Sequence, residues 1–154
     1  MQRITTFLTY NTQAEEAARL YTSVFKNSQI ISTSRWGDGA PAPKGSVMSV
    51  IFEIEGQRFH ALNGGPTFKF TEGISLFVNC ETQAEVDEFS ERLTANGGEQ
   101  GPCGWVKDRF GVSWQIVPSV LGTLLGDQDQ AKAGRVLQAM LKMKKLDIKA
   151  LQEA

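Results

Sequence analysis

The sequence predicts an α+β fold made of two tandem βαβββ modules followed by a C-terminal helical tail. The tetrapeptide Thr-Gln-Ala-Glu occurs at residues 12–15 and again, 70 positions later, at residues 82–85. Each copy follows a run of β-forming residues and precedes an amphipathic segment, so both halves have the same order of elements. After Pro118, apolar residues repeat at helical spacing. We expect one domain over residues 1–154, with modules at about 1–66 and 70–118 and a tail at about 119–154.

The first module begins with a β-rich run at residues 3–10 that leads into a helix. Thr12 and Glu15 have the spacing of a capping box, which predicts the start of this helix. Apolar residues then follow at helical spacing: Ala17, Leu20, Tyr21, Val24 and Phe25. Three further strands are predicted, separated by a Gly/Pro loop and a turn: residues 29–35, 47–54 and 58–63.

The second module repeats this order, starting with a strand at residues 74–79. Its helix carries Val86, Phe89 and Leu93 on one face, and Asn96-Gly97-Gly98 ends it. A short strand and a β-hairpin over residues 105–117 complete the module.

The hairpin has the most informative side-chain pattern. Its turn, Asp108-Arg109-Phe110-Gly111, offers an Asp to hydrogen-bond its own backbone and a Gly to adopt positive φ. On the return strand, Trp114 and Ile116 share one face and Gln115 points to the other. We expect a helix to cover the apolar pair, so that Gln115 faces a pocket and finds a hydrogen-bond partner there.

The tail is predicted to contain a short apolar turn or helix at residues 119–125 and two further helices. Asp127 or Asp129 caps the first of these two helices, and Asp147 caps the last one. One stripe of the middle helix is apolar, with Val136, Met140 and Met143, and Leu137 and Leu141 widen it. Such a stripe favours packing, and we interpret the tail as a lid or a subunit contact within the same domain.

Composition limits the classes of function. With 16 Lys and Arg against 17 Asp and Glu, the net charge of −1 creates no field that would recruit nucleic acid or an anionic membrane. From the residues at 1–10 we expect no signal peptide, and no apolar run reaches the roughly 20 residues that a membrane-spanning helix requires. Cys80 and Cys103 are expected to be reduced thiols, as in a cytoplasmic protein.

Several motifs along the whole chain resemble one protein family. They are Leu-Asn-Gly-Gly-Pro at 62–66, Phe-Lys-Phe at 68–70, Cys-Gly-Trp at 103–105, residues 107–118 of the hairpin and Met-Lys-Lys-Leu-Asp-Ile at 143–148. These motifs resemble the PhnB-like group, often labelled 3-demethylubiquinone-9 3-methyltransferase, of the vicinal-oxygen-chelate superfamily of glyoxalases, extradiol dioxygenases and antibiotic-resistance proteins. The resemblance implies eight main strands in two sheets that together form a curled mixed sheet around a concave pocket, and a homodimer.

The resemblance also indicates where a ligand would bind. Metalloenzymes of the superfamily place His or Glu at matched positions on the first and last strands of each module. These positions fall near Thr6, His60 or Ala61, Gly73 or Ser75, and Gln115. Only His60 is an ordinary metal ligand, and it is otherwise a half-buried strand residue; amides are poor ligands for transition metals. We therefore expect no metal and no cofactor, with a ligand pocket lined by Thr6, His60, Asn63, Ser75, Phe77, Trp105 and Gln115.

The methyltransferase label can be tested against the glycine pattern. A typical methyltransferase holds S-adenosylmethionine on a Gly-rich turn between a strand and a helix of a parallel sheet. The glycines cluster at residues 37–45, 64–65 and 97–104, and none of these clusters lies between a predicted strand and a following long helix. The pattern argues against this activity.

Other candidates for chemistry have structural alternatives. Asp108 and Lys107 form either an acid/base pair or a capped turn beside a surface lysine. Cys103 has no neighbouring His to activate it, so a small buried thiol is the alternative to a nucleophile. No catalytic residue is assigned. Some aromatic side chains are candidates for a pocket for a planar ligand: Trp36, Phe68, Phe70, Phe77 and Trp105.

Together, these observations predict a metal-independent small-molecule-binding protein of this superfamily. The alternatives are a lyase, isomerase or dioxygenase that uses His60 and a divalent metal, and the methyltransferase of the group's label. The expected partners are a small-molecule ligand and a second copy of the chain, with no nucleic acid and no membrane partner.

Overall fold

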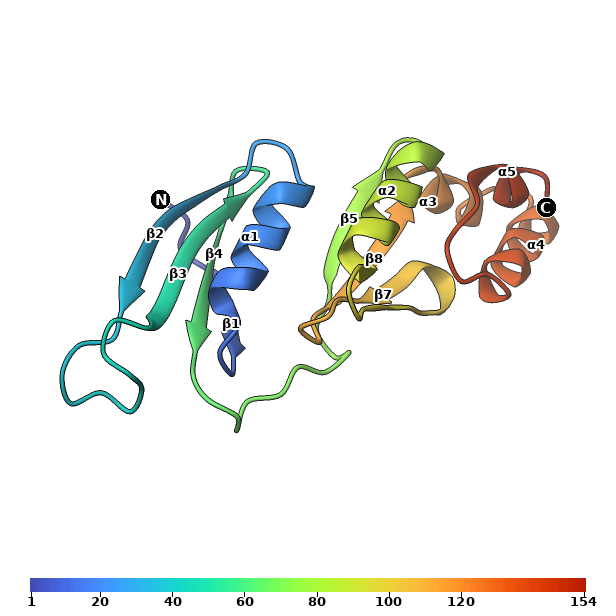
Figure 1. Cartoon of the computed structure of the whole chain (residues 1–154). Coiled ribbons are helices and arrows are strands. Elements are labelled where there is room, and N and C mark those ends of the chain that lie inside the picture. Colours follow the sequence, from blue (N-terminus) through green and yellow to red (C-terminus); the bar gives the residue numbers. More distant parts are fainter. The chain divides into compact units, whose positions relative to one another are not determined.

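The computed structural model describes all 154 residues and divides into two compact units, Met1–Lys69 and Phe70–Ala154. Each unit contains one four-stranded mixed sheet with a helix packed on one face (Figure 1). The α+β fold predicted from the sequence is therefore confirmed.

In the first unit, the strand order is β1-β4-β3-β2, with β1 and β4 parallel and the other pairs antiparallel. Its elements are β1 (Thr6–Tyr10), α1 (Ala14–Val24), β2 (Gln29–Arg35), β3 (Val47–Ile54) and β4 (Gln57–Asn63). Helix α1 packs on the sheet with a face of mostly small residues: Ala14, Ala17, Ala18 and Tyr21. The sheet contributes alternate residues to this core: Leu8, Val50, Phe52, Phe59 and Ala61.

In the second unit, the order β5-β8-β7-β6 reproduces that of the first, and β5 and β8 are again parallel. Its elements are β5 (Leu76–Cys80), α2 (Gln83–Thr94), β6 (Glu99–Gln100), a short 3₁₀ turn (Pro102–Gly104), β7 (Trp105–Lys107) and β8 (Ser113–Pro118). The repeated tetrapeptide therefore marks a duplication of topology.

The two copies of the tetrapeptide begin their helices differently. In α2, Thr82 Oγ1 accepts a hydrogen bond from Glu85 N at 3.2 Å, and Glu81 N donates to Glu85 Oε1 at 3.2 Å. These bonds satisfy amide groups that the helix leaves without partners at its start.

The capping box predicted for Thr12 and Glu15 is wrong. Helix α1 begins one residue later, after Gln13, and has no cap from its own first turn. Asn63, at the end of β4, replaces it: Oδ1 accepts a hydrogen bond from Ala14 N at 2.8 Å. Pro118 ends β8 in the corresponding place and has no side-chain acceptor, so α2 depends on its own Thr82.

The turn predicted for the hairpin is confirmed. Asp108 is only 2% exposed, and its Oδ1 accepts hydrogen bonds from Phe110 N and Val112 N, each at 3.0 Å. Its Oδ2 accepts a third from Trp114 Nε1 at 3.0 Å, and Gly111 adopts a φ of 94°. Asp108 is thus engaged in the structure of the hairpin, which favours its role as a turn cap over an acid/base role.

The tail comprises α3 (Val120–Leu125), α4 (Gln130–Leu141) and α5 (Ile148–Gln152). Of the two predicted caps for α4, Asp129 is the one used, and Asp147 caps α5. A small apolar core inside the second unit consists of Val117, Leu121, Val136, Leu146 and Leu151. Met140 and Met143 pack against this core. None of the helices has the length and apolar character that a membrane crossing requires.

Hydrogen bonds attach the end of the tail to the rest of its unit. Gln83 Nε2 donates to Leu146 O at 2.9 Å, and Gln83 Oε1 accepts from Ile148 N at 2.8 Å. Cys103 N and Gly104 N donate to the carbonyls of residues 143 and 144 at 2.9 and 2.8 Å. Val136, Met140 and Met143 therefore pack within their own unit, whereas Leu137 and Leu141 of α4 are 40% and 54% exposed. The interpretation of the tail as a lid or a subunit contact stays a prediction.

Candidate functional site

Strand alternation gives the second sheet one face covered by α2 and an opposite face, here called the open face, which is open around Gln115, whereas Ser113 and Val117 on the same side of β8 are buried. Trp114 and Ile116 are 2% and 0% exposed on the covered face, so Gln115 points to the open one, as expected from the sequence. The register pairs Gln115 with Phe77 on β5 and with Trp105 on β7. We call Phe77, Gln115 and Trp105 the Gln115 row.

The amide of Gln115 is oriented by a neighbour. Its Nε2 donates a hydrogen bond to Ser75 Oγ at 2.9 Å, which leaves Oε1 as an acceptor on the open face. Phe77 is 54% exposed, whereas Gln115 and Trp105 are half-buried. Four of the predicted pocket residues thus lie together on one face of the second unit: Ser75, Phe77, Trp105 and Gln115.

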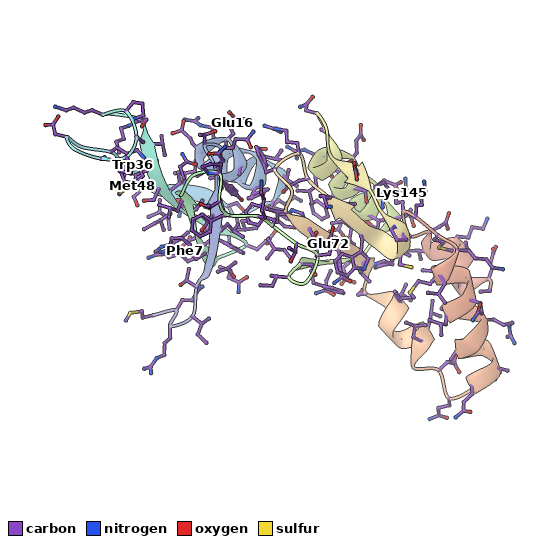
Figure 2. All side chains as sticks on the ribbon, turned by 90° about the horizontal axis from the view of Figure 1, so that it is seen from below. Phe7, Glu16, Trp36, Met48, Glu72 and Lys145 are labelled. Atoms are coloured by element: carbon purple, nitrogen blue, oxygen red, sulfur yellow. The ribbon has the colours of Figure 1, made fainter.

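The first unit has a matching row on its open face. The register pairs Phe7 with His60 and His60 with Ile51, and the Phe7 and His60 ring centroids are 5.8 Å apart. Phe7, labelled in Figure 2, is 55% exposed on β1 and occupies the place that Phe77 has in the second unit. The sequence left the direction of His60 open, and the register places it on the open face. Phe7 was missed, although it lies 70 positions before Phe77, the same offset as the repeated tetrapeptide.

Two other predicted pocket residues of the first unit do not share this face with His60. Thr6 and Leu8 are two positions apart on β1 and therefore lie on the same face of the sheet. Leu8 is buried on that face, which α1 covers. Asn63 caps α1 through Oδ1, and its Nδ2 donates to Val47 O at 3.0 Å. Both ends of the Asn63 amide are therefore hydrogen-bonded to the backbone, which favours a structural role for this residue.

The open faces are poorly supplied with metal ligands. Neither unit gathers three or more His, Cys, Asp or Glu side chains that could hold a metal ion. His60 is the one ordinary transition-metal ligand on the two rows, because Phe7 and Phe77 have no donor atom and Gln115 offers a neutral amide. The residues of the two rows therefore do not fit the metal site that the resemblance to the metalloenzymes implies.

The remaining reactive groups of the second unit are held in structural contacts. Lys107 Nζ lies 2.7 Å from Glu72 Oε1, and this pair raises the pKa of Lys107 and lowers that of Glu72. Burial raises the pKa of the Cys80 thiol to about 12, so this group is protonated at neutral pH. Cys103 Sγ contacts Met140 O at 3.6 Å. These contacts favour structural roles for all four residues.

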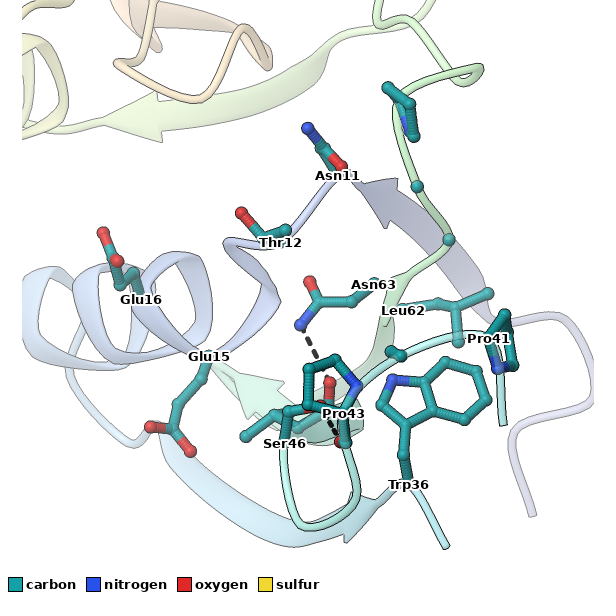
Figure 3. Close-up of a pocket in the computed structure, with 15 residues that line it drawn as sticks. Asn11, Thr12, Glu15, Glu16, Trp36, Pro41, Pro43, Ser46, Leu62 and Asn63 are labelled. Carbon is teal, nitrogen blue, oxygen red and sulfur yellow. Dashed lines mark hydrogen bonds between the residues drawn. The ribbon is translucent and has the colours of Figure 1, made fainter. Parts of the chain in front are cut away.

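Each unit has a hollow that borders residues selected from the sequence. A groove of about 330 Å³ borders Trp105 in the second unit and is also lined by Gln100, Lys107 and Ser113. A larger cavity of about 580 Å³ lies in the first unit, where the loop between β2 and β3 meets the start of α1 and the end of β4 (Figure 3). Asn63 and Trp36 line this cavity.

The glycines do not form a dinucleotide-type or S-adenosylmethionine-type turn. The connections from a parallel strand to a helix are residues 11–13, residues 81–82 and Ser119, and none of them contains a glycine. A Gly-rich turn at this position is what brings backbone amides close to such a cofactor. The structure therefore agrees with the sequence argument against a methyltransferase of that type.

Comparisons with known proteins identify relatives over most of the chain. A family model described as 3-demethylubiquinone-9 3-methyltransferase matches residues 2–117. A putative 3-demethylubiquinone-9 3-methyltransferase, PhnB protein, from Bacillus cereus is 36% identical, with a TM-score of 0.67 over 77% of this chain and 100% of that chain. No curated protein matches the chain.

More distant structures share the fold. A Pseudomonas aeruginosa protein is 24% identical, with a TM-score of 0.60 over 77% of this chain and 98% of its own. A genomically encoded fosfomycin resistance protein, FosX, from Listeria monocytogenes is 19% identical, with a TM-score of 0.53 over 79% of this chain and 96% of its own. These two structures show the fold that the chain shares. The family model and the Bacillus cereus relative show that the chain belongs to the PhnB-like, 3-demethylubiquinone-9 3-methyltransferase family.

Proposed function

We propose that this protein binds a small molecule without a metal, on the open face of the second sheet around Gln115. The observation that carries the proposal is the Gln115 row, in which an amide lies between two aromatic side chains on adjacent strands. Neighbouring strands are about 4.8 Å apart, so the row is wide enough for a planar group to contact both rings.

The chemistry of the row favours binding over catalysis. Gln115 Oε1 can accept a hydrogen bond from an N–H or O–H group of the ligand, and the bond to Ser75 keeps the amide oriented. The row itself contains no carboxylate, imidazole or thiol that could act as a general base or a nucleophile. A carrier or sequestering protein fits this arrangement.

Replacement of Gln115 by leucine should lower the affinity for the ligand without altering the fold. A library of planar heteroaromatic compounds bearing an N–H or O–H donor is screened by native mass spectrometry, and each hit is titrated against the variant. Losing one neutral hydrogen bond should lower the affinity about three- to tenfold. Gln138→Leu, on the exposed surface of α4, is the matched control and should bind like the wild type. Hits that bind Gln115→Leu unchanged, or a library without hits, would contradict the proposal.

The purified protein should contain no stoichiometric metal. Elemental analysis is expected to give far less than one Mn, Fe, Ni or Zn per chain, because the two rows supply one imidazole and one amide. About one metal per chain, lost on His60→Ala, would instead support the metal-dependent lyase, isomerase or dioxygenase. A rise in melting temperature with S-adenosylmethionine would support the methyltransferase.

We also propose that the chain forms a homodimer. The exposed aromatic residues on the open faces, Phe7 and Phe77, favour burial against another surface. Sedimentation velocity at micromolar concentration should give a species of about twice the chain mass of 16.9 kDa. A single species of the monomer mass across the concentration range would refute this proposal.

A further inference from the structure

The cavity of the first unit has walls from three separate parts of the chain. The loop between β2 and β3 contributes Trp36, Pro41 and Pro43, and the end of β4 contributes Leu62 and Asn63 (Figure 3). The connection from β1 to α1 and the first turn of α1 supply the remaining side: Asn11, Thr12, Glu15 and Glu16. Its volume of about 580 Å³ is within the range of small-molecule sites.

The aromatic wall of the cavity is ordered by hydrogen bonds. Trp36 N donates to Ser46 O at 2.9 Å, and Gly45 N donates to Trp36 O at 2.8 Å, so both backbone groups of Trp36 are paired across the loop. Arg35 Nη1 donates to Gly45 O at 3.0 Å and ties the same loop to β2. The backbone that carries the half-buried indole is thus held in place before any ligand arrives, which lowers the entropy cost of ordering the loop on binding.

The charge of the lining has one sign. Glu15 and Glu16 are the charged residues that line the cavity, and no Lys, Arg or His does so. Of the nearby cations, Lys44 lies 3.2 Å from Asp38, whereas Arg19 lies 3.4 Å from Glu15 and so offsets part of the charge of one lining carboxylate. The lining therefore has a negative side on α1 and an apolar side with an indole and two prolines (Figure 3), which favours a positively charged ligand with an apolar body and disfavours an anion.

We infer that this cavity is a second binding site, separate from the Gln115 row, and that it takes a small organic cation such as a primary aromatic amine. The apolar body lies against Trp36, Pro43 and Leu62, where its burial supplies most of the affinity. The ammonium group lies toward Glu15 and Glu16. The carbonyl of Asn11 and the hydroxyl of Thr12 are further acceptors for its N–H groups.

Three matched compounds test the charge preference on the full-length protein. Phenethylamine, 2-phenylethanol and phenylacetate share a ring and chain but carry charges of about +1, 0 and −1 at pH 7. Isothermal titration calorimetry should show that phenethylamine binds about tenfold or more tightly than 2-phenylethanol, and that phenylacetate binds weakest. Equal affinity for the three compounds, tighter binding of phenylacetate, or no binding of phenethylamine at 10 mM (about ten times the weakest Kd expected) would overturn the inference.

Variants locate the binding. Trp36→Ala should lower the affinity for phenethylamine about five- to thirtyfold, and Trp36→Phe should lower it less, because a ring still faces the cation. The double variant Glu15→Gln, Glu16→Gln should bring phenethylamine and 2-phenylethanol to similar affinities.

Control variants are matched to each change. Ile31→Ala removes an exposed apolar side chain from the same strand that precedes Trp36. Glu88→Gln with Glu91→Gln removes two carboxylates from α2, including one with an i,i+4 partner in Arg92, as Glu15 has in Arg19. Both controls should bind phenethylamine like the wild type. Loss of binding in the controls, or unchanged binding in the Trp36 and Glu15/Glu16 variants, would place the amine elsewhere and overturn the inference.

Discussion

Replacing Asp108 by alanine is expected to lower the free energy of unfolding by about 3 kcal/mol, because three donors lose one buried carboxylate. Phe110 N and Val112 N lose their acceptor in the turn, and Trp114 Nε1 loses its acceptor in the core. Trp114 is only 2% exposed, so its indole N–H cannot turn to water without moving the hairpin. Urea unfolding followed by circular dichroism measures the effect.

Two further variants separate the turn from the core. Asp108→Asn keeps one acceptor oxygen for the turn amides but places an NH₂ group opposite Trp114 Nε1, so its loss should be smaller than that of alanine. In a Trp114→Phe background, the destabilisation caused by Asp108→Asn should shrink, since the indole donor is gone. An Asp108→Ala protein as stable as the wild type would show that these hydrogen bonds contribute nothing net.

Replacing Gly104 by alanine is expected to cost about 2–4 kcal/mol and to loosen the tail. Gly104 has a φ of 83°, which disfavours any residue with a Cβ. That Cβ would lie 2.7 Å from Ile116 O and 2.9 Å from Leu146 Cδ1, between the backbone of β8 and the core of the tail. Denaturant unfolding should show the loss, and limited proteolysis should cut residues 143–148 faster.

Two other glycines are matched controls for this substitution. Gly39→Ala has a similar φ of 74° with nothing within 4 Å of the added Cβ, so it should cost only the backbone strain of about 1–2 kcal/mol. Gly134→Ala, inside α4 with open space around it, should stabilise the protein by about 0.5–1 kcal/mol. A Gly104→Ala protein that loses no more stability than Gly39→Ala would show that the two close contacts relax freely.

The candidate site illustrates where sequence patterns are sufficient. The direction of Gln115 followed from alternation around Trp114 and Ile116, because a strand must point neighbouring residues to opposite faces. The same alternation did not orient His60, because Phe59 and Ala61 are apolar neighbours that either face of a sheet accepts. Only the pairing of β1 with β4 placed His60 beside Phe7.

Strand ends also depend on partners that lie far away in the chain. The β-rich run at residues 3–10 becomes a strand only from Thr6, which pairs with Phe59. Before this point, the side chain of Gln2 takes over the pairing: Oε1 accepts from Arg58 N at 2.9 Å and Nε2 donates to Arg58 O at 3.0 Å. A run of residues with high β propensity does not show where the partner strand ends, so the first residue of β1 could not be predicted from the sequence.

The sequence by itself determined the order of elements, the duplication, the turn at Asp108 and the family. All of these depend on periodicity, on local hydrogen bonds or on motifs, which neighbouring residues carry. Only the tertiary structure decided that Asn63 caps α1, that Thr6 lies on the covered side, and that the tail packs on Gln83 and Gly104. These contacts join residues up to 65 positions apart, as for Gln83 and Ile148. The two identical Thr-Gln-Ala-Glu segments have different partners because the residues that reach them come from distant parts of the chain, which differ between the two units.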